Sequence, residues 1–566
     1  MENPALRVLR FDELEKMYKQ IAPLGDGARF FQAMIDGLHV ELDSGGKEWA
    51  KVPATGPVVV VANHPFGLLE GAALMTKLLA VRPDVKVLAN SILATVPEVK
   101  DWFIEINPFG GREAVRFNQR GLRQAIEWLK EGKLLVVFPA GEVSHLQWKK
   151  MAVTDPDWHS TVARLIRRSG ATSVPVYIKG ANSALFQILG MFHAKVRTAL
   201  LPHEFLNKQN RRVEIRVGSP VAPAQAESLT SDEALTRYLR WRTYLLEHRR
   251  EGMPAKPQPV APAMISRARP ASVEGEVAAL PSAQFLAQSG DQQVYVATAR
   301  QIPRLLDEIG LLREAAFRAV GEGTGSDKDL DEFDGHYRHL FSWSRKNQEV
   351  IGAYRLGLTD EILRGHGVRG LYTSTLFNYH RDFLREVEPA IELGRSFVRP
   401  EYQKSFASLL VLWKGIGQFI VRNPHYRMLF GPVSISNDYS PVSRQFMVDY
   451  LRTRQSDPRL SRLVKARQPF RTWPFGPKLD WSVDLEELSA IIADIERDGK
   501  GVPVLLRQYL KLGGRLAAFN VDPKFSRCLD GLIVVDLAQT DRTMLERYMG
   551  SEGADSFLNF HRQLVA

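Results

Sequence analysis

The stretch VVVVANHPFGLLEGAAL (residues 58–74) decides the fold of the first half of this 566-residue chain. Its first residues are all apolar and predict a buried strand, and the Asn-His-Pro-Phe-Gly run at 63–67 predicts a turn where that strand ends. Glu70 follows His64 by six positions, about one turn into the next segment. A strand that ends on a histidine and is followed by a carboxylate places two reactive side chains at the edge of a sheet.

Short β-rich segments alternate with helical patterns throughout this half of the chain. Such alternation predicts an α/β domain with a mainly parallel sheet that carries its chemistry at the strand ends. The other β-rich segments are VKVLAN (85–90), KLLVVFPAG (133–141), TSVPVYIKG (172–180) and VEIRVGSPV (213–221), and the clearest helical pattern is NQRGLRQAIEWLKEG (118–132).

The composition predicts two domains joined by a linker. Residues 253–290 are rich in Pro, Ala, Gln and Ser, which is typical of a linker. The first domain is expected to span residues 1–252 and the second residues 291–566, where helical and strand patterns alternate again. The expected fold class is therefore α/β for both domains.

The net charge of +11 predicts an acidic partner: nucleic acid, anionic lipid or an acidic carrier protein. The single cysteine, Cys528, excludes an internal disulfide, and the charged first residues do not resemble a signal peptide. No window approaches the roughly 18 apolar residues of a spanning helix. We therefore expect a cytoplasmic protein that touches a membrane without crossing it. The arginine-rich segment 234–252 either lies on an anionic membrane or packs its apolar stripe on its own domain.

His64 and Glu70 together could activate a hydroxyl group without a covalent intermediate. The imidazole would take the proton of a substrate hydroxyl as its oxygen attacks a thioester, and the carboxylate would hold the ring tautomer and offset its charge. The nucleophile would then come from the substrate. For an isolated histidine, a structural residue with satisfied hydrogen bonds is the simpler interpretation.

Three further blocks follow His64 in order: a Gly/Arg-rich block (107–133), the Pro-acid block LLVVFPAGEVS (134–144) and the Val-Pro strand SVPVYIKG (173–180). Over residues 55–221 this series resembles the glycerolipid (PlsC-like) acyltransferase family that makes phosphatidic acid. The resemblance implies that His64 is the general base and Glu70 its acid partner. It also implies an acceptor site that includes Asn63, Arg112, Arg116, Gly141 and Glu142.

Two positions depart from that family's pattern. The usual spacing is His-x4-Asp, but Leu69 occupies that position and the acid comes one residue later. In the third block Ala140 stands where glutamate is usual. These departures put recognition of a phosphate on the acceptor in doubt, and the blocks look more like the branch that acylates aminolipids.

The second domain centres on AIELGRSFVRPEYQKSFASLLVLWKGIGQFI (390–420), a predicted strand, turn and amphipathic helix. Amides at such a helix N-terminus suit a phosphopantetheine thioester, and the layout resembles that of the GNAT superfamily of acyltransferases. The turn at 403–407 lacks the glycines that allow close approach to a CoA pyrophosphate. Acyl carrier protein is therefore the expected donor rather than acyl-CoA, because its acidic surface suits a basic enzyme.

Over residues 291–540 the chain resembles the ornithine N-acyltransferase ("hemolysin-like") branch of that superfamily, most sharply in ELGRSFV (392–398). The resemblance implies that Glu392 or Asp334 accepts a proton from an attacking amine, and that Arg355, Arg395 and Arg399 line the substrate site. The alternative for Glu392 and Arg395 is an ordinary salt bridge at the strand end. Positioning alone could also carry much of the rate, without an essential base.

Together the two domains resemble the bifunctional ornithine lipid synthases. The resemblance implies that the C-terminal domain attaches a 3-hydroxyacyl chain to an amino acid and that the N-terminal domain esterifies its 3-hydroxyl. The implied partners are acyl carrier protein, an amino acid such as ornithine, a lyso-aminolipid and the anionic inner face of the bacterial cytoplasmic membrane. No nucleic acid, cofactor or metal is expected. Two alternatives stay open: a lysophospholipid (1-acylglycerol-phosphate) acyltransferase with an accessory C-terminal domain, and a non-catalytic membrane-binding protein.

Overall fold

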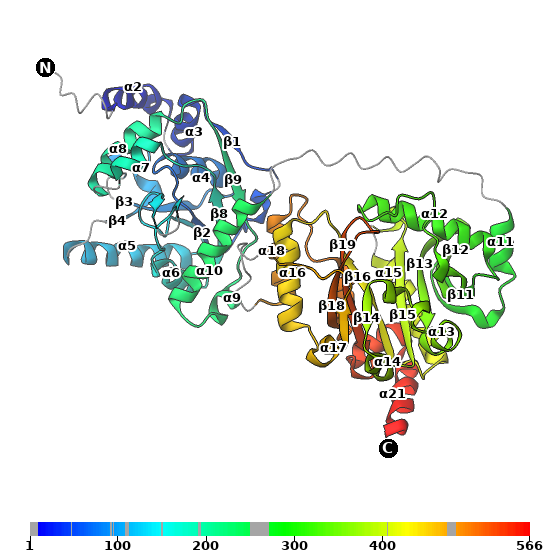
Figure 1. Ribbon diagram of the computed structural model, residues 1–566. Coiled ribbons are helices and arrows are strands. Elements are labelled where there is room, and N and C mark those ends of the chain that lie inside the picture. The colour runs from blue at the N-terminus through cyan, green and yellow to red at the C-terminus, as the bar shows by residue number, and fades with distance from the viewer. Residues whose placement is uncertain are drawn as a thin grey trace. The chain divides into compact units, whose positions relative to one another are not determined.

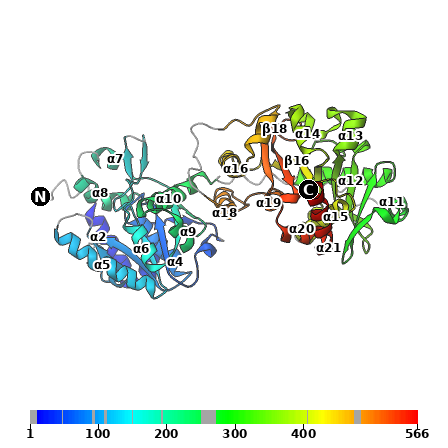
Figure 2. The ribbon, with the colours of Figure 1, turned by 90° about the horizontal axis from the view of Figure 1, so that it is seen from below.

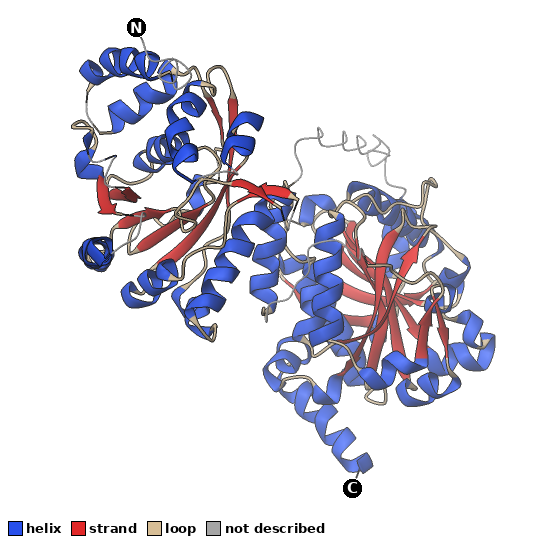
Figure 3. Cartoon of the chain, turned by 60° about the vertical axis from the view of Figure 1, so that its left-hand side comes forward, coloured by secondary structure: helices blue, strands red, loops and turns tan. Residues whose placement is uncertain are grey.

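The computed structural model describes residues 10–25, 27–46, 48–90, 93, 95–107, 112–148, 151–190, 194–249, 271–403, 406–472 and 483–565. The chain forms two compact units, Met1–Arg249 and Arg250–Ala566. Both are α/β, which confirms the predicted fold class. Figure 1 labels their helices and strands, and in Figure 3 each unit shows a sheet with helices packed around it.

The N-terminal unit contains a seven-stranded sheet with the order β1-β9-β8-β2-β5-β3-β4. Neighbouring strands are parallel except for β8 and β9. A separate hairpin pairs β6 with β7. The strands are β1 (Glu41–Asp43), β2 (Val58–Ala62), β3 (Val85–Asn90), β4 (Phe103–Ile106), β5 (Leu134–Val137), β6 (His145–Gln147), β7 (Ala152–Thr154), β8 (Thr172–Ile178) and β9 (Arg212–Val217).

Strand β2 lies in the middle of this sheet, and all of its side chains are buried. A parallel strand between two neighbours is covered on both faces, so an unbroken apolar run suits it better than an alternating one. The helices of the unit are α2 (Phe11–Ile21), α3 (Ala28–Gly37), α4 (Leu69–Leu79), α5 (Arg112–Lys130), α6 (Thr161–Ser169), α7 (Ala184–Gly190), α8 (Ala194–Leu206), α9 (Pro223–Ser228) and α10 (Asp232–Leu245).

Helix α10 settles the two interpretations of the arginine-rich segment for its described residues. It packs against α6 and β8, and it buries Leu235, Tyr238 and Leu239 within its own unit. Arg242 is buried as well and donates to the hydroxyl of Tyr238 at 2.8 Å. The apolar stripe of α10 therefore serves the core of the domain and is not available to a membrane.

The C-terminal unit contains an eight-stranded sheet with the order β10-β11-β12-β13-β15-β16-β19-β18, in which only β15 and β16 pair in parallel. β14 and β17 form a small separate sheet. The strands are β10 (Phe285–Ser289), β11 (Gln292–Thr298), β12 (Arg338–Ser344), β13 (Glu349–Leu358), β14 (Phe377–Tyr379), β15 (Ala390–Val398), β16 (Met428–Ile435), β17 (Val464–Ala466), β18 (Arg515–Asp522) and β19 (Cys528–Asp536).

Two hydrophobic clusters form cores of this unit, one including Phe377, Phe383 and Phe430 and the other including Ile309, Phe341 and Phe397. The helices are α11 (Ala271–Ala278), α12 (Pro303–Ala319), α13 (Thr359–His366), α14 (Arg381–Val387), α15 (Phe406–Arg422), α16 (Pro441–Arg454), α17 (Pro458–Leu463), α18 (Leu485–Ile495), α19 (Val504–Lys511), α20 (Arg542–Met549) and α21 (Ser551–Val565).

The parallel pairing of β15 with β16 ends early, although both strands continue. The register runs only from Ala390 opposite Met428 to Glu392 opposite Phe430. Just beyond it, β15 carries a bulge against β13, and Arg395 in this bulge has a left-handed φ of 47°. A bulge bends a strand and re-aims a side chain, so this is where the sheet opens and presents Arg395.

The predicted linker is wrong in its second half. Residues 250–270 lie outside the described residues, but 271–289 contribute α11 and β10 to the C-terminal unit. Val273 and Val277 of α11 are buried in the cluster around α12, and β10 pairs with β11 at the edge of the sheet. Two valines at helical spacing gave this Pro- and Ala-rich segment enough apolar surface to fold.

Candidate active sites

The candidate site of the N-terminal unit is the pair His64 and Glu70. His64 follows β2, and Glu70 lies in the first turn of α4. The Nδ1 atom of His64 is 2.7 Å from Oε1 of Glu70, which also accepts the backbone N–H groups of Phe66 and Gly67 at 2.9 and 2.8 Å. The extra residue in the His-x5-Glu spacing is accommodated because the helical glutamate reaches back to the turn.

Electrostatics at this pair suit a base. Burial disfavours the charged imidazole, but the carboxylate of Glu70 outweighs it and raises the pKa of His64. Burial likewise opposes ionisation of Glu70, yet His64 and the backbone N–H of Gly67 lower its pKa. Since Nδ1 faces Glu70, Nε2 is the ring nitrogen left for a substrate hydroxyl. The ring of Phe138 stacks on the imidazole, with centroids 4.5 Å apart.

A second buried acid, Asp155, holds the backbone around His64 and was missed by the sequence analysis. Its Oδ1 accepts the backbone N–H of His64 at 3.1 Å and the hydroxyl of Ser144 at 2.5 Å, and its Oδ2 accepts from the indole of Trp158 at 2.9 Å. Ser144 in turn donates its backbone N–H to the His64 carbonyl at 2.7 Å. No spacing pattern could reveal this contact, because Asp155 lies 91 residues after His64.

The other predicted acceptor residues have other partners or are exposed. Asn63 is used structurally, because its side chain bonds the backbone N–H and carbonyl of Ile178 and ties β2 to β8. Gly141 turns the chain after β5 with a φ of 67°, and Glu142 beside it makes an exposed ion pair with Arg197. Arg116 is exposed on α5. Arg112 begins that helix, and its side chain lies outside the described residues.

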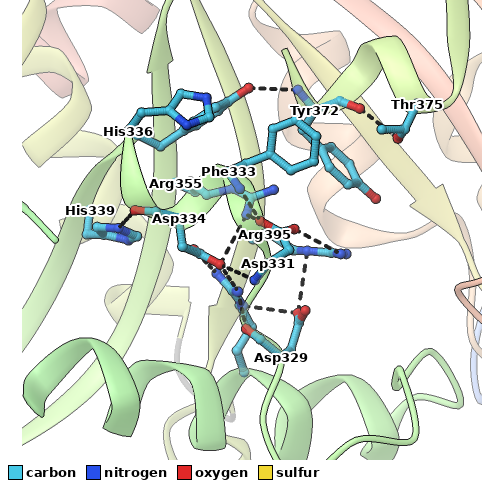
Figure 4. Close-up of polar contacts among 12 residues, drawn as sticks. Asp329, Asp331, Phe333, Asp334, His336, His339, Arg355, Tyr372, Thr375 and Arg395 are labelled. Atoms are coloured by element: carbon cyan, nitrogen blue, oxygen red, sulfur yellow. Dashed lines mark hydrogen bonds and ion pairs between the residues drawn. The ribbon is translucent and has the colours of Figure 1, made fainter. Parts of the chain in front are cut away.

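In the C-terminal unit a network of buried ion pairs surrounds the bulge. Figure 4 shows aspartates and arginines from β13, β15 and the segment before β12 converging there. Arg355 is 2.5 Å from Asp331 and 3.3 Å from Asp334, and Arg395 is 3.4 Å from Asp329. Arg313 of α12 completes the network through Asp329 and Asp334, both at 3.0 Å.

This network does not favour Asp334 as a proton acceptor. Burial would raise the pKa of Asp334, but the adjacent Arg313 and Arg355 lower it far below its usual range. Asp334 also closes a capping box with Asp331 around the short helix Glu332–Gly335. A carboxylate held this firmly in its ionised form anchors the arginines instead of taking a proton.

One of these arginines retains a donor that an anion could use. Nη2 of Arg355 is buried and makes no hydrogen bond within the described part of the chain, whereas Nε of Arg395 faces Oδ2 of Asp329 at 3.4 Å. The Arg395 guanidinium lies over the rings of Tyr372 and Phe525, at 4.8 and 4.9 Å. A buried donor without an acceptor costs free energy, so binding of a carboxylate at this donor would be favourable.

Glu392 is buried and makes different contacts from those considered in the sequence analysis. It accepts the hydroxyl of Tyr337 and, at 2.7 Å, the backbone N–H of Thr373. The salt bridge with Arg395 is therefore the wrong alternative, because Arg395 pairs with aspartates instead. Burial raises the pKa of Glu392, which suits a proton acceptor.

Asp530 of β19 is the second acid that the sequence analysis missed. It is buried and accepts the hydroxyl of Ser434 at 2.7 Å. The positive charge of Arg395 acts to lower the pKa of Asp530, against the effect of burial. Burial raises its pKa to about 7, and burial and the Asp530 charge raise the pKa of Glu322 to about 8. The available signal was an acid inside the apolar run LDGLIVV (529–535), where a strand would normally exclude one.

Arg399 and the turn at 403–407 were also predicted to contribute. Arg399 is paired with Glu349 at 2.5 Å and with Glu401 at 3.1 Å, beyond the end of β15. Residues 404 and 405 lie outside the described residues, so the turn remains a sequence prediction.

Comparison with known proteins agrees with this division into two sites. Residues 10–252 match the family described as Acyltransferase, and residues 312–414 match the family described as Acetyltransferase (GNAT) domain. Two proteins named glycine N(alpha)-acyltransferase, from Phocaeicola vulgatus and Bacteroides thetaiotaomicron, are each 31% identical to this chain, over 243 and 250 residues. These matches cover 40% and 42% of this chain and 74% of each relative.

The chain belongs to the same acyltransferase family as these two relatives. The acyltransferase is also similar to the solved 1-acyl-sn-glycerophosphate acyltransferase PlsC from Thermotoga maritima, at 20% identity over 44% of this chain and 86% of that one, with a TM-score of 0.26. Among its described residues, no helix is long and apolar enough to cross a membrane. The two family matches show that the enzyme joins an acyltransferase region to a GNAT domain, and acyl transfer is its chemistry.

Proposed function

We propose that this acyltransferase makes a two-chain aminolipid of the ornithine lipid type in two steps. The C-terminal unit would acylate the α-amine of an amino acid with a 3-hydroxyacyl chain, and the N-terminal unit would then esterify the 3-hydroxyl. The observation that supports the proposal is that one chain holds two different sites: a His64–Glu70 pair in one unit, and in the other a GNAT domain with a buried arginine donor.

The first step would form an amide bond. The carboxylate of the amino acid would bind Arg395 and the free Nη2 of Arg355, which leaves the amine to attack the thioester carbonyl. The C–N bond forms, the C–S bond breaks and a thiol leaves. Either Glu392 or Asp530 would take the amine proton, and the pKa of Asp530, at about 7, is the better match to neutral pH.

The second step would form an ester at His64. The 3-hydroxyl of the lyso-aminolipid would give its proton to Nε2 as its oxygen attacks a second acyl thioester. Glu70 would stabilise the resulting imidazolium, which then protonates the departing thiolate. The names of the two glycine N(alpha)-acyltransferases support an amino acid as the first acceptor. Acyl carrier protein is the proposed donor because of the net charge of +11.

The test uses the purified full chain with 3-hydroxyacyl carrier protein and, in parallel, ornithine, lysine, glycine or glutamine. Mass spectrometry should detect an N-acyl amino acid, and acyl-CoA should be the poorer donor. Asp530→Asn and Glu392→Gln, compared at matched folding, would identify the proton acceptor. If no amino acid is acylated while lysophosphatidic acid is, the enzyme is a lysophospholipid acyltransferase and the proposal is wrong.

A further inference from the structure

The β6–β7 hairpin is rooted at the catalytic histidine of the N-terminal unit. Ser144, directly before β6, donates its backbone N–H to the His64 carbonyl at 2.7 Å. Asp155, directly after β7, accepts the His64 backbone N–H at 3.1 Å. Both ends of the hairpin are therefore fixed to His64, and about four residues at roughly 3.3 Å each place Trp148 about 13 Å away along the strand.

This hairpin carries apolar side chains on one face and at its turn. Leu146 pairs directly with Val153, so their side chains lie on the same face. Trp148 and Met151 follow directly beyond these strands, at the turn of the hairpin, where Met151 has a left-handed φ of 48°. His145 and Gln147 lie on the opposite face, where their side chains contact each other at 3.0 Å.

The apolar face is exposed although its residues are large. Trp148 is 62% exposed, Met151 75% and Val153 39%. Among the described residues the hairpin forms a two-stranded sheet of its own. Apolar side chains that are exposed next to one another are a candidate interaction surface.

Helix α7 lies beside the hairpin and also exposes apolar side chains. The Gln187 side chain of this helix accepts the backbone N–H of Leu146 at 2.9 Å, which fixes α7 beside β6. Leu185 and Ile188, three residues apart on one helix face, are 42% and 53% exposed. In Figure 2 the two short strands of the hairpin stand out from the N-terminal unit next to α7.

We propose that the apolar faces of the β6–β7 hairpin and α7 dock on an anionic lipid bilayer and so hold His64 at the membrane surface. An amphipathic tryptophan suits the interface between headgroups and acyl chains. The chain has a net charge of +11, which favours an anionic surface over a neutral one.

This inference rests on the proposed function only for the reason why a lipid surface would help the reaction. A lyso-aminolipid acceptor has a long acyl chain and partitions into the bilayer, whereas the hydroxyl that reacts lies near its headgroup. A hairpin that inserts at its tip and holds His64 at its base would bring that hydroxyl to Nε2. The surface itself can be tested without any acyl substrate, so the two proposals can fail separately.

The experiment measures binding of the full chain to phosphatidylcholine vesicles with and without 30 mol% phosphatidylglycerol. The variant Trp148→Ser/Met151→Ser should bind anionic vesicles roughly tenfold more weakly or worse, because two apolar side chains no longer insert. Val504→Ser is the matched control, since Val504 is 59% exposed on α19 of the other unit. Thermal unfolding of each variant checks that folding is intact.

Three results would overturn the proposal. Unchanged vesicle binding by the folded double variant would show that the hairpin is not the docking element. Equal binding to neutral and anionic vesicles would remove the role of charge. A change in oligomeric state by the double variant in the absence of vesicles, with no change in vesicle binding, would make this face a contact between two copies of the chain.

Discussion

Replacement of Asp530 by asparagine should change how the stability of the C-terminal unit depends on pH. Asparagine keeps the size of the side chain and can still accept from the Ser434 hydroxyl, which lies 2.7 Å from Oδ1. It removes only the ionisation. Burial raises the pKa of Asp530 from 3.8 to about 7, so the folded chain holds this proton far more tightly than the unfolded chain does.

The sign and size of the effect follow from this difference. A raised pKa in the folded state stabilises the protein at low pH, and that stabilisation is lost as the pH rises from about 4 to about 7. Three pH units at about 1.4 kcal/mol each give up to about 4 kcal/mol, of which about 2–3 kcal/mol falls between pH 5 and pH 8. The loss of the Asp530 charge also lowers the pKa of Glu322, which further weakens the pH dependence of stability in the variant.

Thermal unfolding of the full chain at pH 5 and pH 8 measures the effect. The wild-type transition of the C-terminal unit should move down more steeply with pH than that of Asp530→Asn, by roughly 5–10 °C over this range. Asp327→Asn, at an exposed position, is the control and should follow the wild type. Parallel pH dependence of the wild type and Asp530→Asn would refute the claim that Asp530 is protonated when buried.

Three further variants test the two sites. Glu70→Gln should slow ester formation by about 10²-fold. It should also move the acidic limb of the pH–rate profile to lower pH, because Glu70 raises the pKa of His64 and a base works only when it is unprotonated. An acidic limb that does not move would contradict the pairing of His64 with Glu70. Arg355→Met should lower the free energy of unfolding, measured by chemical denaturation, by about 3–5 kcal/mol, because Asp331 and Asp334 lose their partner. A loss below about 1 kcal/mol would contradict a coupled network. Gly431→Ala should lower the free energy of unfolding by about 1–3 kcal/mol and reduce N-acylation. The reason is that the added Cβ would lie 2.0 Å from the Leu393 carbonyl oxygen, where β15 and β16 separate. Wild-type stability and activity would show that this close approach does not matter.

The N-terminal pair could be predicted because its parts are adjacent in sequence. A buried strand, a turn and a helix start necessarily place residues six positions apart near each other, and the structure puts His64 and Glu70 2.7 Å apart. Asp155 could not be predicted, because a hairpin excursion and a further turn return it to His64. Such a contact depends on tertiary packing, which leaves no periodic trace.

The C-terminal site was harder to predict from the sequence for a similar reason. The sequence marks β15 as a strand, but the bulge with a left-handed arginine at 395 is invisible, because glycine would be the expected residue there. Asp329 and Arg313 join the network only through the packing of α12 on the sheet. The linker prediction failed because composition outweighed the spacing of two valines in α11.

The most direct test of the central claim is mass spectrometry of total lipids from a bacterial host that makes no aminolipids. Expression of the intact chain should produce a new lipid with one amino acid and two acyl chains. His64→Ala should stop at the single-chain amide, and Arg395→Gln should produce neither. Diacylated aminolipid from folded His64→Ala, or altered phosphatidic acid pools with no aminolipid at all, would contradict the account.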